Sequence, residues 1–283
     1  MVENRPFVVF LTHLILVVGV VLIALPIWIT FVAASHSEIR MTQVPLPLWP
    51  GDQLWINFKN TLFGNGLAGT ETAPVWLMLT NSLVMAMMIS LGKISISLLS
   101  AFAIVYFKFP FRMGIFWLIF ITLMLPVEVR ILPTFEVVAQ LGMLNSYWGL
   151  TVPLIASATA TFMFRQVFLT IPDEMLESAR IDGAGPMRFF WDILLPLSRT
   201  NIAALFVILF IYGWNQYLWP LLITTDQDMT TIVISIKQML EVAEASPQWN
   251  IVMMVALLAM LPPILVVIGM QKLFVQGLTE TDK

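Results

Sequence analysis

The sequence of 283 residues contains no cysteine and only two histidines, and charged residues make up 11% of it. Without cysteine, the chain can form neither a disulfide nor a thiolate site. No group of histidines and carboxylates has the spacing of metal ligands, so we expect no metal and no other cofactor. Apolar residues, by contrast, are in excess: they make up 59% of the chain, against about 45–50% in soluble domains, and the mean hydropathy is +0.90. These values predict an all-α protein that crosses a membrane several times, because long apolar runs satisfy their backbone groups in lipid as helices.

A P-loop for nucleotide binding is also missing. That loop requires the pattern Gly-x-x-x-x-Gly-Lys-[Ser/Thr]. The nearest fragment is Gly92-Lys93-Ile94-Ser95, where Met87 occupies the position of the first glycine and Ser95 comes one place late. The fragment also lies inside an apolar run. We therefore expect that the chain does not hydrolyse ATP and is not an enzyme.

Six apolar segments predict six spans within a single domain that covers residues 1–283. The first segment is similar to a secretory signal, but it is far longer than the apolar core of about 7–15 residues in such signals. We interpret it as a retained helix, long enough to cross about 30 Å of hydrocarbon. An outer segment, residues 231–245, is expected to form a surface helix. The expected spans are residues 6–34, 81–107, 113–127, 147–168, 201–222 and 251–274.

Lysine and arginine predict the orientation, because the loops inside the cell carry the excess of these residues. With the amino terminus inside, nine of the 14 fall on the cytoplasmic side and four outside, while Lys93 lies within the second span. The nine are Arg5, Lys108, Arg112, Arg165, Arg180, Arg188, Arg199, Lys272 and Lys283, and the four are Arg40, Lys59, Arg130 and Lys237. Both termini and the polar segment 170–200 are therefore predicted to lie in the cytoplasm.

Residues 170–200 have the pattern of two short helices joined by a turn. Pro172-Asp173-Glu174 predicts a helix start with proline at the first position and acids in the first turn. Gly183 predicts its end, since glycine accepts the left-handed backbone found there. A second helix is expected over residues 187–194, closed by Pro196. Its apolar tip, which would contact a partner or lie on the bilayer, consists of Met187, Phe189 and Phe190.

The same segment carries a motif. Glu177-Ser178-Ala179-Arg180-Ile181-Asp182-Gly183 is followed, after nine residues, by Ile193-Leu194-Leu195-Pro196. This resembles the E-A-A-x-x-x-G-x9-I-x-L-P loop of ABC-importer permeases, which docks onto the ATPase subunit; Ser178 replaces the second alanine. The spacing favours docking over a loop that lies on the bilayer. The resemblance implies that ATPase coupling rests on Glu177, Ser178, Ala179, Asp182, Gly183, Ala184, Met187, Phe190 and Pro196.

Residues 141–150 and 213–220 resemble the carbohydrate class of these permeases, to which the maltose permease subunits belong. Residues 124–130 and 157–162, supported by residues 1–6, are similar to a permease subunit of sn-glycerol-3-phosphate importers. The resemblance implies the type I ABC importer permease fold, the bacterial inner membrane, and uptake of sn-glycerol-3-phosphate or related glycerophosphodiesters; another sugar or polyol is the alternative. The implied partners are a sister permease subunit, a dimer of the ATPase subunit, a periplasmic substrate-binding protein and the lipid bilayer, with no nucleic acid.

Lys93 is the one ionisable residue expected deep in a span, where a cation costs about 2.5–3.5 kcal/mol on insertion scales. It either forms a structural hydrogen bond to another helix, or faces the pathway and attracts an anion. Glu128 and Arg130, at the outer end of the third span, either pair with each other or help to admit the anion. The possible pathway or substrate residues are Lys93, Glu128, Arg130, Trp214 and Asn215.

Two other classes of membrane protein fit the sequence less well. An ion-coupled secondary transporter predicts acidic residues inside its spans, and the cores of these six contain none. An intramembrane enzyme could pair Lys93 with Ser95 or Ser97 as a nucleophile. Serine is, however, common where membrane helices pack together.

Overall fold

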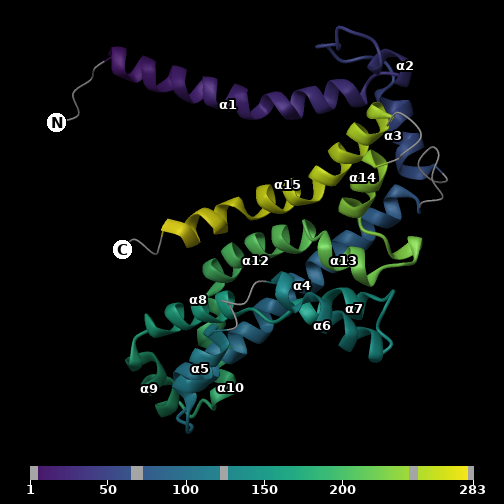
Figure 1. Ribbon diagram of the computed structural model, residues 1–283. Coiled ribbons are helices and arrows are strands. Elements are labelled where there is room, and N and C mark those ends of the chain that lie inside the picture. Colours follow the sequence, from purple (N-terminus) through teal and green to yellow (C-terminus); the bar gives the residue numbers. More distant parts are fainter. Residues whose placement is uncertain (1–5, 65–72, 122–126, 242–247, 280–283) are drawn as a thin grey trace. The chain divides into compact units, whose positions relative to one another are not determined.

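The computed structural model describes residues 6–64, 73–121, 127–241 and 248–279, and all regular elements in these ranges are helices. The all-α class expected from the composition is confirmed. The chain divides into two compact units. The first unit comprises residues 1–77 and 235–261, and the second comprises residues 78–234 and 262–283. Figure 1 labels the helices, and each unit is described separately below.

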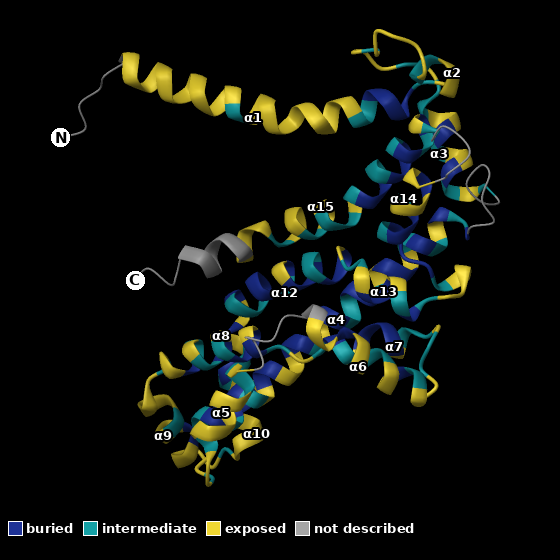
Figure 2. Cartoon of the chain, in the orientation of Figure 1, coloured by how far each residue is buried: buried dark blue, intermediate teal, exposed yellow. Residues whose placement is uncertain are grey.

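The first unit contains α1 (Pro6–Ala34), α2 (Glu38–Met41) and α3 (Leu54–Phe63). The surface of α1 is apolar on all sides and exposed along nearly its whole length, and its side chains become buried only from Val32 onward (Figure 2). An isolated helix of this kind cannot be stable in water. It therefore requires lipid or another protein around it.

A small polar junction fixes the chain where α1 ends. The side-chain amide of Asn57, on α3, donates to the carbonyl oxygens of Ala34 and His36, each at 2.8 Å. The N–H of Gly51 donates to Ser35 Oγ at 2.7 Å. These bonds satisfy backbone groups that a helix end leaves without partners.

The second unit is built along α4 (Val75–Tyr106). The helices that follow are short, and several are joined end to end. They are α5 (Arg112–Ile121), α6 (Val127–Gln140), α7 (Tyr147–Thr151), α8 (Ala158–Leu169), α9 (Asp173–Ile181), α10 (Pro186–Phe189), α11 (Leu195–Leu197), α12 (Arg199–Trp214) and α13 (Leu218–Ile223). Two more helices, α14 (Ile232–Leu240) and α15 (Trp249–Thr279), each run from one unit into the other. The expected surface helix is α14, but its buried side chains show that it is only half exposed.

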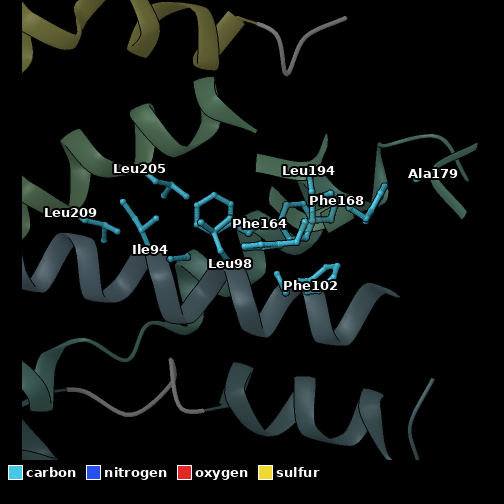
Figure 3. Packing of buried hydrophobic residues seen from close by; sticks show 13 residues of the cluster. Ile94, Leu98, Phe102, Phe164, Phe168, Ala179, Leu194, Leu205 and Leu209 are labelled. Carbon is cyan, nitrogen blue, oxygen red and sulfur yellow. The ribbon is translucent and has the colours of Figure 1, made fainter. Parts of the chain in front are cut away.

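One apolar cluster holds the carboxyl-terminal half of α4 against α8, α12 and the polar segment between them. In Figure 3 the side chains of Ile94 and Leu98, on α4, point toward Leu205 and Leu209 of α12. The fully buried Phe164 on α8 belongs to the same cluster. The segment 170–200 is therefore attached to the packed part of the unit rather than suspended from flexible ends.

A second cluster surrounds the amino-terminal half of α4, and a polar network lies beside it. Asn81 donates to the carbonyl oxygens of Asp228 and Thr230 at 2.7 and 3.1 Å, and accepts from the hydroxyl of Tyr147 at 2.6 Å. Asn145, with φ of 53°, accepts from the N–H of Thr225 at 2.7 Å. These asparagines connect the segment after α6 with the segment after α13.

The helices overlap the expected spans, but not every helix is long enough to count as a span by itself. Residues 7–34, 75–106 and 249–273 are long and apolar enough to cross a membrane, and two bent helix pairs raise this count to five at most. The ten-residue α5 coincides with the start of the third expected span, whose residues 122–126 lie outside the described ranges. Six spans fit this arrangement and remain a prediction.

Three helices differ in their bounds from the expected spans, whose limits in the membrane remain predictions. The helix of the second expected span begins at Val75, before residue 81. The fourth is broken between residues 154 and 158 by a bend of 52°, beside a short 3-10 helix that contains Pro153. The fifth ends at Trp214, and Leu218 begins a separate helix. At that break, the side chain of Asn215 donates to the carbonyl oxygen of Ile211 at 3.0 Å, which satisfies an acceptor at the helix end.

Candidate functional site

The first helix of the polar segment, α9, ends in a tight left-handed turn. Pro172 is the residue before the helix, not its first residue as predicted, and Asp173 and Glu174 occupy the first turn. Gly183 has φ of +74°. Its N–H donates to the carbonyl oxygen of Arg180 at 3.0 Å, and the N–H of Ala184 donates to that of Ala179 at 2.9 Å. This pair of bonds is the Schellman motif, so the predicted role of Gly183 in ending the helix is confirmed.

The second helix of the segment is longer and less regular than predicted. It begins at Pro186, preceded by Gly185, and passes through a π-helical turn over Phe190–Leu194. Pro196 does not close it, because the helical backbone continues to Leu197 before a bend of 74° into α12. Pro196 lacks an N–H for a bond to an earlier carbonyl. The wide turn immediately before it accommodates that missing donor.

The expected coupling residues divide between the surface and the interior. Glu177, Ser178, Asp182, Gly183, Met187 and Pro196 are exposed, and Ala184 is half-buried. Ala179 and Phe190 are buried, at 4% and 3% exposure. A partner protein can therefore reach most of the motif directly, but not these two side chains.

The predicted apolar tip of Met187, Phe189 and Phe190 was wrong for the two phenylalanines. The Phe190 ring lies 5.0 Å from that of Phe102 on α4, and the Phe189 ring lies 5.2 Å from that of Tyr106 (centroid distances). Apolar side chains pack wherever they can leave water, and the carboxyl-terminal end of α4 offers them that surface. The phenylalanines thus fasten the loop to α4, and only Met187 is presented outward.

Sequence reasoning missed two exposed apolar residues on α9. Ile181 is 85% exposed and Met175 is 38% exposed. Ile181, two residues after the buried Ala179, lies on the opposite side of the helix, whereas Met175, four residues before Ala179, lies on the same side. Ile181 lies within the sequence motif, between Glu177 and Gly183, so the sequence alone could have drawn attention to it. Together with Met187, these residues give the surface of the loop an apolar component.

Lys93 is buried between helices of the second unit. It lies near the middle of α4 and is 8% exposed, and its Nζ is 3.9 Å from the centroid of the Tyr212 ring on α12. The face of an aromatic ring attracts a cation through its quadrupole, so this contact suits a charged lysine.

The other candidate pathway residues differ in exposure and in contacts where the structure describes them. Arg130 is exposed. Trp214 is 3% exposed and stacks on Phe210 at 6.0 Å between ring centroids, and its place in a pathway remains a prediction. Asn215 is exposed and caps the end of α12. Glu128 is part of α6, but its side chain lies outside the described part of the chain, so its pairing with Arg130 remains a prediction.

Comparison with known proteins gives matches along the whole chain. Residues 93–280 match the family described as "Binding-protein-dependent transport system inner membrane component". The sn-glycerol-3-phosphate transport system permease protein UgpE of Agrobacterium fabrum is 58% identical over 283 residues, which is 100% of both chains. The protein of the same name from Yersinia enterocolitica is 57% identical over the same length.

Two solved structures share the fold. A chain of a bacterial ABC transporter involved in the import of the acidic polysaccharide alginate matches with a TM-score of 0.81, over 96% of this chain and 98% of that one, at 18% identity. A chain of the alginate transporter in complex with an alginate pentasaccharide-bound periplasmic protein matches with a TM-score of 0.55, over 77% and 84%, at 16% identity. At these identities the likeness concerns the fold alone, and it confirms the expected fold of an ABC importer permease.

Proposed function

The chain belongs to the family of binding-protein-dependent transport system inner membrane components, and we propose that it forms one half of the pore of an importer for sn-glycerol-3-phosphate and related glycerophosphodiesters. In such systems the ATPase is a separate subunit. The chain is accordingly a permease subunit and not an enzyme.

The coupling role is inferred from the way in which the segment 170–200 packs against α4. Its inner side is fastened to α4 through Phe189 and Phe190, while Glu177, Asp182 and Met187 face outward. A loop built in this way transmits force, since a push on its outer surface reaches α4 through packed rings that cannot compress. We infer that the ATPase subunit contacts this outer surface and that its closure moves the loop together with α4.

The proposed assembly contains a sister permease subunit, two copies of the ATPase subunit and a periplasmic substrate-binding protein. The uncovered apolar surface of α1 suits contact with lipid and with a sister subunit. Both termini and the segment 170–200 lie in the cytoplasm in this proposal, as the distribution of lysine and arginine predicts.

The proposed substrate rests on the full-length relatives and on charge. Relatives that are 58% and 57% identical over 100% of this chain carry the name of sn-glycerol-3-phosphate permeases. Lys93 is a buried cation of the second unit, with its Nζ 3.9 Å from the centroid of the Tyr212 ring. A cation with little exposure to water attracts an anion. A phosphate monoester is such an anion, whereas an uncharged sugar or polyol is not.

The experiment is uptake by the complete importer reconstituted in vesicles with its binding protein and ATPase. Labelled sn-glycerol-3-phosphate should accumulate in an ATP-dependent manner, and unlabelled glycerophosphodiesters should compete with it. Uncharged glycerol and maltose should not compete. ATP-dependent uptake of a neutral sugar in place of the phosphate ester would retain the permease but overturn the substrate. Uptake driven by an ion gradient without ATP would overturn both.

A further inference from the structure

The end of the second unit that carries α5, α9 and α10 (Figure 1) contains a cavity that is lined in part by α9 of the coupling segment. Its volume is about 610 Å³. It lies between the connection from α4 to α5 and the first turns of α9. Its polar lining consists mainly of Tyr106, Lys108, Arg112, Asp173, Glu177 and Arg180.

The basic residues of this cavity lack carboxylate partners. Lys108, Arg112 and Arg180 all line it, and within the described ranges none of them is within 4.0 Å of a carboxylate oxygen. The two acids that share the lining, Asp173 and Glu177, therefore leave these cations unpaired. Three cations beside two carboxylates leave a net positive charge in a concave space, which attracts an anion.

The cavity lies beside the start of an apolar helix. Arg112 is the first residue of α5, and the exposed apolar side chains of that helix include Ile115, Trp117 and Leu118. The residue before the helix, Phe111, is 85% exposed and has φ of 61°, a backbone conformation that a bulky residue rarely adopts. An exposed aromatic side chain beside cations is typical of the membrane–water interface. A phospholipid has the matching form: acyl chains along α5 and a phosphate beside Lys108 and Arg112.

We propose that this cavity binds the headgroup phosphate of an anionic phospholipid from the cytoplasmic leaflet and that the bound lipid supports ATPase coupling. Glu177 and Arg180 belong to α9 and line the same space. A headgroup held there contacts the α4–α5 connection and the coupling helix together. Its presence stabilises one position of α9, so the importer should couple ATP hydrolysis better in anionic membranes.

The test compares the whole importer in nanodiscs of phosphatidylcholine alone with nanodiscs that contain increasing fractions of phosphatidylglycerol. The measurement is ATPase activity stimulated by the loaded binding protein. The wild type should be stimulated more strongly as phosphatidylglycerol increases. In Lys108→Gln/Arg112→Gln, the fraction needed for half-maximal stimulation should rise by at least about 3-fold, because each cation contributes to attraction of the lipid. Lys272→Gln is the matched control, since Lys272 is exposed and lies outside both the cavity and the segment 170–200. It should respond like the wild type.

Several outcomes would overturn the proposal. One is an equal lipid response of the wild type and the double variant. Another is a loss of response in the Lys272→Gln control as well. If inorganic phosphate added to phosphatidylcholine nanodiscs replaces phosphatidylglycerol, the cavity takes free phosphate and not a lipid. Should the double variant fail to assemble, Lys108→Arg/Arg112→Lys keeps both charges and should keep the lipid response; its loss would count against the proposal. Failed uptake by the wild type in every lipid would instead contradict the proposed function.

Discussion

The ammonium of Lys93 lies 3.9 Å from the centroid of the Tyr212 ring, where α4 and α12 pack closely. Gly213, beside Tyr212, permits this approach, because a Cβ atom there would lie 3.0 Å from the Cα atom of Ala86 on α4. The face of an aromatic ring attracts a cation, and a charged lysine could in turn attract an anion. The contact is therefore one that a charged lysine can make.

Replacing Lys93 by methionine should separate the structural role of the side chain from its charge. Methionine keeps its length and apolar stem, and it removes a cation that is costly within a bilayer. We expect uptake of sn-glycerol-3-phosphate to fall by about tenfold or more, which corresponds to about 1.4 kcal/mol, while assembly and basal ATPase activity persist. The measurement is the initial rate of uptake, together with co-purification of the partner subunits.

Lys93→Arg is the control for this prediction. It keeps the positive charge and can stack on the Tyr212 ring, so it should retain more uptake than the methionine variant. Unchanged uptake in Lys93→Met would show that the charge plays no part in transport. Loss of assembly in both variants would assign Lys93 a structural role instead.

The Lys93 contact illustrates how far the sequence alone could predict this site. A single lysine in a long apolar run is conspicuous, so it was identified without a structure. Its partner Tyr212 was not identified, because helix packing decides which residue of α12 faces Lys93, and sequence periodicity does not encode that packing.

The same limit applies to Phe189 and Phe190. Their apolar character was evident, but the choice between an outward contact and the end of α4 depended on tertiary structure. The Gly183 turn, in contrast, is a local backbone property, and local patterns predict such turns well.

Substitution of Gly183 should impair coupling through its backbone conformation rather than through a clash. The φ of +74° disfavours residues other than glycine, yet no atom lies within 4 Å of the position of an added Cβ. A left-handed backbone costs an L-residue roughly 1–2 kcal/mol, and asparagine tolerates it better than other residues do. Gly183→Val should therefore abolish most stimulation of ATPase activity by the loaded binding protein, and Gly183→Asn should retain most of it. Equal activity of the two variants would contradict a conformational role for this turn.

The buried and exposed apolar residues of the coupling loop should behave differently on truncation. Phe190 is 3% exposed and packs on Phe102, so Phe190→Ala should lower the free energy of unfolding by about 3–5 kcal/mol. Met187 is 52% exposed, and Met187→Ala should leave thermal stability nearly unchanged. We expect Met187→Ala to weaken co-purification of the ATPase subunit in spite of that stability. The measurements are the thermal midpoint of the purified permease pair and the amount of ATPase subunit retained. A destabilised Met187→Ala, or a stable Phe190→Ala, would reverse the proposed division of the loop.

The orientation of the chain can be measured directly, because it has no native cysteine and any introduced thiol is the only one. Ala184 follows the Gly183 turn in the coupling loop and is half-buried, and Asp228 lies in an exposed 3-10 helix between α13 and α14. The excess of lysine and arginine predicts that the first faces the cytoplasm and the second the outside. A membrane-impermeant maleimide should therefore label Asp228→Cys in intact cells, and should label Ala184→Cys only in inverted vesicles. Each variant must still support uptake, which controls for misfolding. Labelling of Ala184→Cys from outside would contradict the orientation and, with it, the contact between this loop and a cytoplasmic ATPase.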